Sequence, residues 1–293
     1  MEDFESKKRK RQKKKDSDDD DMDIEDETEL TMEPKQINEE VNVEFIFSNI
    51  VEENFQSIRS LLQPLFAFED INPSDLFDLL LFQHEDVGTT IKSENEVYGV
   101  FSYIPLTYYK NLPNHNKFVD KFYLYLRTKI ETYLKDSEKK KIALDIIGND
   151  CNNLGMLINE RAVNMPQETI PPALGLITKE IRECREIEEY DKRYEFDYLV
   201  IVSRFVKILD KNTKGKKPIL GSEYKDDKAY YKFETPHFIN QSVVSFDYKI
   251  PYKEKNMEYL ENQNEPKYMN ILIIKAKDYF TILKNKFNCD IEL

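Results

Sequence analysis

Hydrophobic positions recur along this chain with two different spacings. A two-residue alternation is typical of strands, and a spacing of three or four residues is typical of helices that bury one face. Strands are therefore expected over residues 41–47, 87–91, 97–104, 154–158, 196–209, 229–233, 243–250 and 268–274. Helices are expected over residues 51–65, 72–82, 115–134, 137–147, 170–184 and 276–287.

Capping and breaking residues place some of the helix ends. Ser48 or Asn49 can cap the first helix, and Pro64 is expected to limit its end because proline donates no backbone hydrogen bond. The sequence Asn72-Pro73-Ser74 announces the second helix.

The order of the expected elements indicates a fold class. Strands and helices interleave throughout, which predicts an α/β fold with one central sheet, mixed or mostly antiparallel, flanked by helices. The opening order of strand, helix, helix, strand, strand, helix is that of acetyltransferase-like (GNAT-like) folds, although a shared fold says little about chemistry. We expect a single domain of this type over residues 41–293, preceded by a separate tail of residues 1–40.

Half of the net charge lies in that tail. The formal charge of the chain is −13; residues 1–40 contain 16 acidic and 9 basic residues, so they carry −7 and the rest of the chain −6. Blocks of like charge do not collapse into a core. The tail is therefore expected to be disordered.

The basic part of the tail is a dense run of cations. It consists of Lys7, Lys8, Arg9, Lys10, Arg11, Lys13, Lys14 and Lys15. Such a run binds importin as a nuclear localisation signal, or binds nucleic acid as a basic arm. Because an acidic tract adjoins it and the whole chain is negative, nuclear import is the favoured interpretation and direct nucleic-acid binding is not expected.

The acidic part of the tail, residues 16–29, has two interpretations of equal weight. It can screen a very basic client, such as a ribosomal protein, by competing with nucleic acid for its lysines and arginines, or it can serve only to solvate the protein. Ser17 is followed directly by aspartates, a context that acidophilic kinases accept. Phosphorylation of Ser17 would deepen the negative charge.

The sequence lacks the common signatures of catalysis, metal binding and membrane insertion. Its seven glycines do not form the R/Q-x-x-G-x-G/A pattern with which acetyltransferases cradle a pyrophosphate. The first residues contain no apolar region typical of a signal peptide, and the apolar stretches are too short to span a bilayer. No ligand spacing links the histidines and cysteines, which are His84, His115, His237, Cys151, Cys184 and Cys289. We expect no catalytic residue, metal or cofactor.

The most distinctive segment is LGMLINERAVNMPQETIPPAL, residues 154–174. A strand is expected to end near Ile158, Asn164 can cap the next helix, and Pro166 with two later prolines fixes how that helix begins. The segment resembles the signature of the BCCIP family, named for binding a breast-cancer recombination mediator and a cyclin-dependent-kinase inhibitor. The resemblance extends to VNVEF (41–45), NFQSIRSLLQPLF (54–66), VGTTIK (87–92), VYGVFSYIPL (97–106), YLVIVSRFV (198–206) and residues 268–287.

The resemblance implies a nuclear protein that can shuttle to the cytoplasm, with an acetyltransferase-like fold and no established acetyl transfer. Relatives protect a large-subunit ribosomal protein, assist nuclear export of a client lipid kinase and, in animals, join genome-maintenance complexes. The leading hypothesis is a monomeric nuclear chaperone or adaptor in ribosome biogenesis. A scaffold in DNA repair and cell-cycle control is the alternative, and a divergent acyltransferase is the third hypothesis.

Four residues of the signature are candidates for partner binding or for structure, namely Glu160, Arg161, Asn164 and Pro166. For Glu160 and Arg161 we expect the structural role of holding the strand end and the helix start together, rather than contact with a client. One departure from the family pattern is the acidic insertion that follows the VGTTIK-like segment in some relatives, which is reduced here to residues 93–96.

Overall fold

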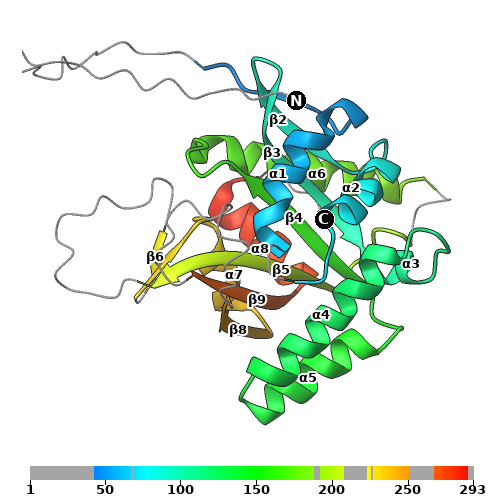
Figure 1. The fold of residues 1–293 in the computed structure, drawn as a ribbon, viewed down its shortest axis with the longest axis vertical. Helices are drawn as coiled ribbons and strands as arrows, with labels where there is room; N and C mark the ends of the chain where they lie inside the picture. Colours follow the sequence, from blue (N-terminus) through cyan, green and yellow to red (C-terminus); the bar gives the residue numbers. More distant parts are fainter. Residues whose placement is uncertain are drawn as a thin grey trace, which may run out of the picture. The chain divides into compact units, whose positions relative to one another are not determined.

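The computed structural model describes residues 43–66, 69–187, 192–207, 223–225, 227–250 and 267–289. Its strands form one sheet in the order β1-β2-β3-β4-β5-β7-β6, and β9 joins β5 to β8 (Figure 1). The strands are β1 (Ile46–Asn49), β2 (Thr89–Ser93), β3 (Glu96–Pro105), β4 (Leu154–Arg161), β5 (Tyr198–Lys207), β6 (Glu223–Lys225), β7 (Lys228–Tyr230), β8 (Val244–Lys249) and β9 (Lys267–Lys275).

Strand β5 is the centre of the sheet, and a fork opens beside it. It pairs with β9 over nine residues, from Tyr198 to Val206, and this pairing occupies one edge. On the other edge, β4 pairs in parallel only as far as Val200, whereas β7 pairs antiparallel from Phe205 to Lys207. Strands β4 and β5 therefore diverge beyond Val200, and β7 pairs with the last residues of β5 on the edge that β4 has left.

Helices cover both faces of the sheet (Figure 1). They are α1 (Phe55–Phe66), α2 (Pro73–Phe82), α3 (Leu106–Lys110), α4 (Lys117–Tyr133), α5 (Ser137–Gly148), α6 (Ile170–Arg185), α7 (Thr235–Gln241) and α8 (Ala276–Phe287), with 3-10 turns η1 (Glu52–Asn54) and η2 (Gln167–Thr169). The first five helices contribute to one hydrophobic core and the last three to another. The sheet thus forms the middle of three layers.

Successive side chains of the central strands point alternately into the two hydrophobic cores. In β5, Val200 and Val202 face the core with α1 to α5, while Leu199 and Ile201 face the core with α6 to α8. Strands buried on both faces read as continuous apolar runs rather than as alternating ones. For that reason residues 199–202 of β5 form an uninterrupted apolar run.

The hairpin between β2 and β3 is closed by two residues, Glu94 and Asn95. Both have positive φ, 49° and 70°, as in the type I′ turn that matches the twist of paired strands. Ser93 pairs with Glu96 directly across this turn. The reduced insertion noted in the sequence is therefore a minimal hairpin.

The predicted α/β architecture, with helices flanking a mixed sheet, is confirmed. The predicted start of a helix at Asn72-Pro73-Ser74 is also confirmed: α2 begins at Pro73, and the side chain of Asn72 caps it by accepting from the N–H of Ser74. The first strand begins later than expected, at Ile46, which is opposite Lys92; β2 extends only one residue further, to Ser93, before the hairpin turn. Pro64 lies inside α1 rather than limiting it, since burial of Leu65 and Phe66 stabilises one further half-turn.

Two short helices, α3 and α7, were not expected from the sequence. They span five and seven residues, too few for a helical period to be recognised. Strand β4 continues three residues beyond the expected end at Ile158, and it carries Glu160 and Arg161 within it. No helix among the described residues is long and apolar enough to cross a membrane.

Candidate functional site

The signature residues Asn159, Glu160 and Arg161 lie on the last part of β4, beside the fork. The side chains of Glu160 and Arg161 are only 2% and 7% exposed. Charged residues are rarely buried to this degree unless they are paired. The residues that surround Glu160 and Arg161 therefore show whether these charges are paired inside the protein or available to a partner.

Arg161 forms an ion pair with the carboxylate of Glu234, the residue that precedes α7. Its two terminal nitrogens donate to the two carboxylate oxygens of Glu234 at 2.8 and 2.9 Å, a bidentate arrangement. Asn159 completes the cluster, since it donates to Glu234 at 2.6 Å and accepts from Arg161 at 2.7 Å. Burial alone would raise the pKa of Glu234, but the guanidinium of Arg161 outweighs it and holds that pKa below its ordinary value.

Glu160 is paired with Lys232, a second charged residue of that segment, through one of its oxygens. It forms a short hydrogen-bonded ion pair with Lys232, and its other oxygen lies 4.0 Å from Arg204 of β5. Burial lowers the pKa of Lys232, although the negative charge of Glu160 opposes this shift. Both charges of the signature are thus neutralised inside the protein.

The network closes the fork between β4 and β5. The backbone N–H of Tyr231 donates to the carbonyl of Arg204, which places the segment after β7 against β5. Lys232 and Glu234 then reach across to β4. The signature joins β4 to the segment before α7, and the expected link from Glu160 and Arg161 to the following helix is wrong. The burial of Glu160 and Arg161 supports the expected structural role, because side chains this enclosed present almost no surface to a partner.

The other two signature residues lie in the connection from β4 to α6. Asn164 is exposed in a turn and does not cap α6, because the 3-10 turn η2 separates them and the helix cap is Thr169. Pro166 instead precedes η2, and its carbonyl accepts hydrogen bonds from the N–H and the hydroxyl of Thr169. Proline residues 171 and 172 have no N–H, so the first turn of α6 offers few backbone donors to a phosphate.

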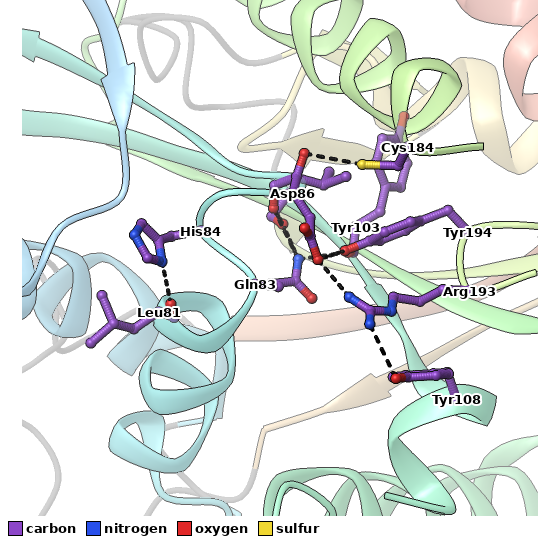
Figure 2. Close-up of polar contacts among 11 residues, drawn as sticks. Leu81, Gln83, His84, Asp86, Tyr103, Tyr108, Cys184, Arg193 and Tyr194 are labelled. Atoms are coloured by element: carbon purple, nitrogen blue, oxygen red, sulfur yellow. Dashed lines mark hydrogen bonds and ion pairs between the residues drawn. The ribbon is translucent and has the colours of Figure 1, made fainter. Parts of the chain in front are cut away.

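A second polar cluster lies between the end of α2 and the segment 192–196 (Figure 2). Arg193 contacts Asp86 at 2.5 Å and donates to the hydroxyl of Tyr108 at 3.1 Å, and Figure 2 shows the guanidinium between these two groups. The hydroxyl of Tyr194 also donates to Asp86, at 3.3 Å. Burial raises the pKa of the nearby Cys184 thiol to about 11, so at neutral pH this sulfur is not a nucleophilic thiolate.

A hollow of about 440 Å³ adjoins this cluster. It is lined by the start of α3, the start of β4 and the segment 192–196, including Lys192 and Glu195. These two charges have opposite signs, and Arg193 is already paired with Asp86. The hollow therefore favours neither an anion nor a cation, and its chemistry assigns no ligand.

The histidines have structural contacts. His84 donates from Nδ1 to the carbonyl of Leu81 at 2.7 Å, His115 stacks on Phe82 at 3.8 Å, and His237 packs edge-on against Phe287. Among the described residues, no group of three or more His, Cys, Asp or Glu side chains is placed to hold a metal ion.

Comparison with known proteins identifies the family. The sequence model of the BCCIP family matches residues 40–265, which is most of the chain. This chain belongs to the BCCIP family. The membership confirms the resemblance carried by the signature, and the buried network described above lies within the matched residues.

Curated BCCIP relatives are distant in sequence. The BRCA2 and CDKN1A-interacting protein of Bos taurus is 28% identical over 73% of this chain and 71% of its own length. Protein BCP1 of Debaryomyces hansenii is 29% identical over 58% of this chain and 56% of its own length.

A solved BCCIP-family structure has the same fold. The crystal structure of BCP1 from Saccharomyces cerevisiae has a TM-score of 0.54 and 18% identity, covering 86% of this chain and 92% of that one. An agmatine N-acetyltransferase gives a TM-score of 0.39 at 5% identity, covering 79% of this chain and 99% of its own. That value is too low to support a conclusion.

The sequence did not single out the partners of the signature. Lys232, Glu234 and Arg204 complete the network, yet each is distant in sequence from β4, Lys232 by 72 residues from Glu160. One signal was present: in the run Tyr230 to Glu234, charges at alternate positions share one face of an otherwise aromatic segment. The basic run Lys7 to Lys15 and Ser17 lie outside the described residues, so their roles remain predictions.

Proposed function

We propose that this protein is a nuclear chaperone or adaptor that escorts a basic large-subunit ribosomal protein and assists nuclear export of clients, among them a lipid kinase. The observation that carries the proposal is membership of the BCCIP family. Two properties of the chain support it. The net charge of −13 favours association with a basic partner, and the signature charges are paired inside the protein rather than arranged for catalysis.

A second function has an observation of its own. The bovine relative is named for interaction with BRCA2 and CDKN1A, which favours a scaffold in DNA repair and cell-cycle control. The two functions predict different partners in the same compartment. They are therefore separable by one experiment.

That experiment is a native pull-down of the tagged full-length protein from nuclear extract. Enrichment of a basic large-subunit ribosomal protein is the expected result, and its loss at raised salt would reflect the charge of the complex. Recovery of recombination proteins or a kinase inhibitor without ribosomal proteins would transfer support to the second function. A tagged acidic protein of similar size and charge serves as the control for nonspecific capture.

We further propose that the basic run of the tail, Lys7 to Lys15, directs nuclear import through importin. The full-length protein with this run replaced by glutamine is expected to move from nucleus to cytoplasm. The matched control replaces Lys139 and Lys141, exposed lysines of α5, and should leave the distribution unchanged. A nuclear signal that survives the first replacement would refute the assignment.

A divergent acyltransferase is the least supported function. The fork between β4 and β5 contains the buried network, and the start of α6 has two prolines where backbone donors would be needed. Calorimetric titration with acetyl-CoA is expected to give no binding in the micromolar range. Binding of that strength would reopen the question of catalysis.

A further inference from the structure

Strand β1 lies at the edge of the sheet. It pairs antiparallel with β2 through residues 46–49, and it has no second partner among the strands that the structure describes. The outward N–H and C=O groups of an edge strand are a template on which another extended segment can pair. Many proteins bind peptides by adding a strand at such an edge.

Apolar side chains are exposed along this edge. Val43 is 53% exposed, Ile46 55% and Phe47 36%, so one five-residue stretch contains three of the nine large hydrophobic side chains exposed in the described part of the chain. Phe45, between them, packs edge-on against Tyr98 and anchors the stretch to the sheet. Scattered exposed hydrophobics are ordinary, whereas these three side chains are concentrated at one edge of the sheet, with Phe47 on one face and Ile46 on the other.

The charges around the edge have one sign. Glu44 precedes β1, Glu52 and Glu53 follow it, and Glu94 and Glu96 flank the turn of the neighbouring hairpin; all five are exposed. None of them forms an ion pair with another described residue. The two segments 43–54 and 89–96 contain a single basic residue, the half-buried Lys92. The edge is therefore an apolar strip with an acidic rim.

We propose that β1 binds an extended, positively charged segment of a client, which adds to the sheet as a further strand. Backbone hydrogen bonds to β1 would supply affinity. Successive side chains of a strand point to opposite faces, so Ile46 and Phe47 lie on opposite faces of the sheet. Apolar side chains of the segment would cover Phe47 on one face, and lysines or arginines on the other face would extend along Ile46 and meet the glutamate rim. This site rests on the proposed function, because a basic ribosomal protein is the kind of client that carries such a segment.

Other occupants fit the same edge less well. A second copy of the chain would bring two acidic rims together, and the acidic tract of the tail has the same sign as the rim. The basic run Lys7 to Lys15 has the right charge but no apolar side chain with which to cover Ile46 and Phe47.

Fluorescence anisotropy with the full-length protein tests the site. The probe is a short labelled peptide in which lysine and valine alternate. Replacing Ile46 and Phe47 by serine, or Glu44 and Glu94 by glutamine, is expected to weaken binding at least about tenfold. The controls on α4, Leu124→Ser and Glu131→Gln, also alter exposed residues and should change affinity less than about twofold.

A second probe isolates the backbone contribution. The same peptide N-methylated at alternate residues keeps its side chains and charge but loses the N–H groups that would pair with β1, so its binding is expected to disappear. Equal affinity for both peptides would overturn strand addition. No binding of the unmodified peptide, or equal losses in the α4 controls, would also overturn it. Thermal unfolding of each variant by circular dichroism verifies that the fold is retained.

Two further outcomes would assign the edge to another occupant and reject the proposal. One is a concentration-dependent dimer in sedimentation that is abolished by Ile46→Ser with Phe47→Ser. The other is a tenfold gain in peptide affinity when the tail lysines and arginines 7–15 are replaced by glutamine, which would indicate that the tail itself covers β1. If the pull-down still recovers a ribosomal protein with the β1 variants, the chaperone function stands and the β1 site alone is rejected.

Discussion

Arg161 is the residue on which the buried network depends most. It binds both oxygens of Glu234, so removing it leaves that carboxylate enclosed without a cation. Breaking a buried ion pair in this way typically costs 3–5 kcal/mol, because the remaining charge stays unsolvated. We therefore expect Arg161→Ala to lower the free energy of unfolding by about that amount, measured by urea denaturation.

The control for this change is an exposed pair. Lys179 and Glu183 are both 56% exposed on α6 and lie 3.5 Å apart. Lys179→Ala should cost no more than about 0.5 kcal/mol. If Arg161→Ala were equally mild while abolishing recovery of clients, the signature would be a binding site rather than a structural one.

Glu180 on α6 makes stability depend on pH. Its carboxylate accepts a hydrogen bond from the N–H of Gly88 at 2.9 Å, yet burial raises its pKa from 4.5 to about 7. The folded state thus binds this proton more tightly than the unfolded state. The resulting stabilisation is present below about pH 4.5 and is lost as the pH rises through 7.

Glu180→Gln should remove that dependence, because the amide is neutral at every pH and its oxygen can still accept from Gly88. The variant is expected to match the native protein near pH 4 and to be more stable by about 1–3 kcal/mol at pH 8. Chemical denaturation at both pH values measures the difference. Glu183→Gln, at an exposed position one turn on, is the control and should show little change; parallel pH profiles of Glu180→Gln and the native protein would contradict the assignment.

At the scale of elements, the sequence predicted most strands and helices but not the end of β4. Apolar runs such as 198–206 are visible because burial on both faces leaves few polar positions. Glu160 and Arg161 resembled loop residues because charges are rarely buried, and nothing local indicates the partners that make burial tolerable. Those partners come from β5 and from the segment after β7, so only the fold brings them together.

The short parallel contact of β4 with β5 also makes a glycine necessary. A Cβ added at Gly155 would lie 2.7 Å from ring atoms of Phe196 and 2.8 Å from Leu199, closer than real contacts. Gly155→Ala is therefore expected to cost about 1–3 kcal/mol. Gly148, the last residue of α5, has no atom within 4 Å of such a Cβ, and Gly148→Ala should be neutral or slightly stabilising. Equal unfolding midpoints for the two variants would show that the sheet relaxes around Gly155.

At the scale of the whole molecule, the sequence showed the net charge and its concentration in the tail directly. The central sheet followed from the interleaving of elements, whereas the acidic rim of β1 required the fold, since Glu44 and Glu94 are distant in sequence and are brought to one edge by the pairing of β1 with β2. Net charge is a long-range property. It acts on association rates more than on the stability of the complex.

This long-range effect gives a test of the acidic tract. If the tract attracts basic clients, replacing Asp18, Asp19, Asp20 and Asp21 by asparagine in the full-length protein should slow association with poly-L-lysine about tenfold at low salt, because four of the charges that steer encounter are gone. The difference should vanish at 1 M salt, where the Debye length is about 3 Å. Stopped-flow fluorescence measures both rates, and Asp145→Asn with Asp278→Asn on the body is the control. A tract that only solvates the protein would leave the low-salt rate unchanged.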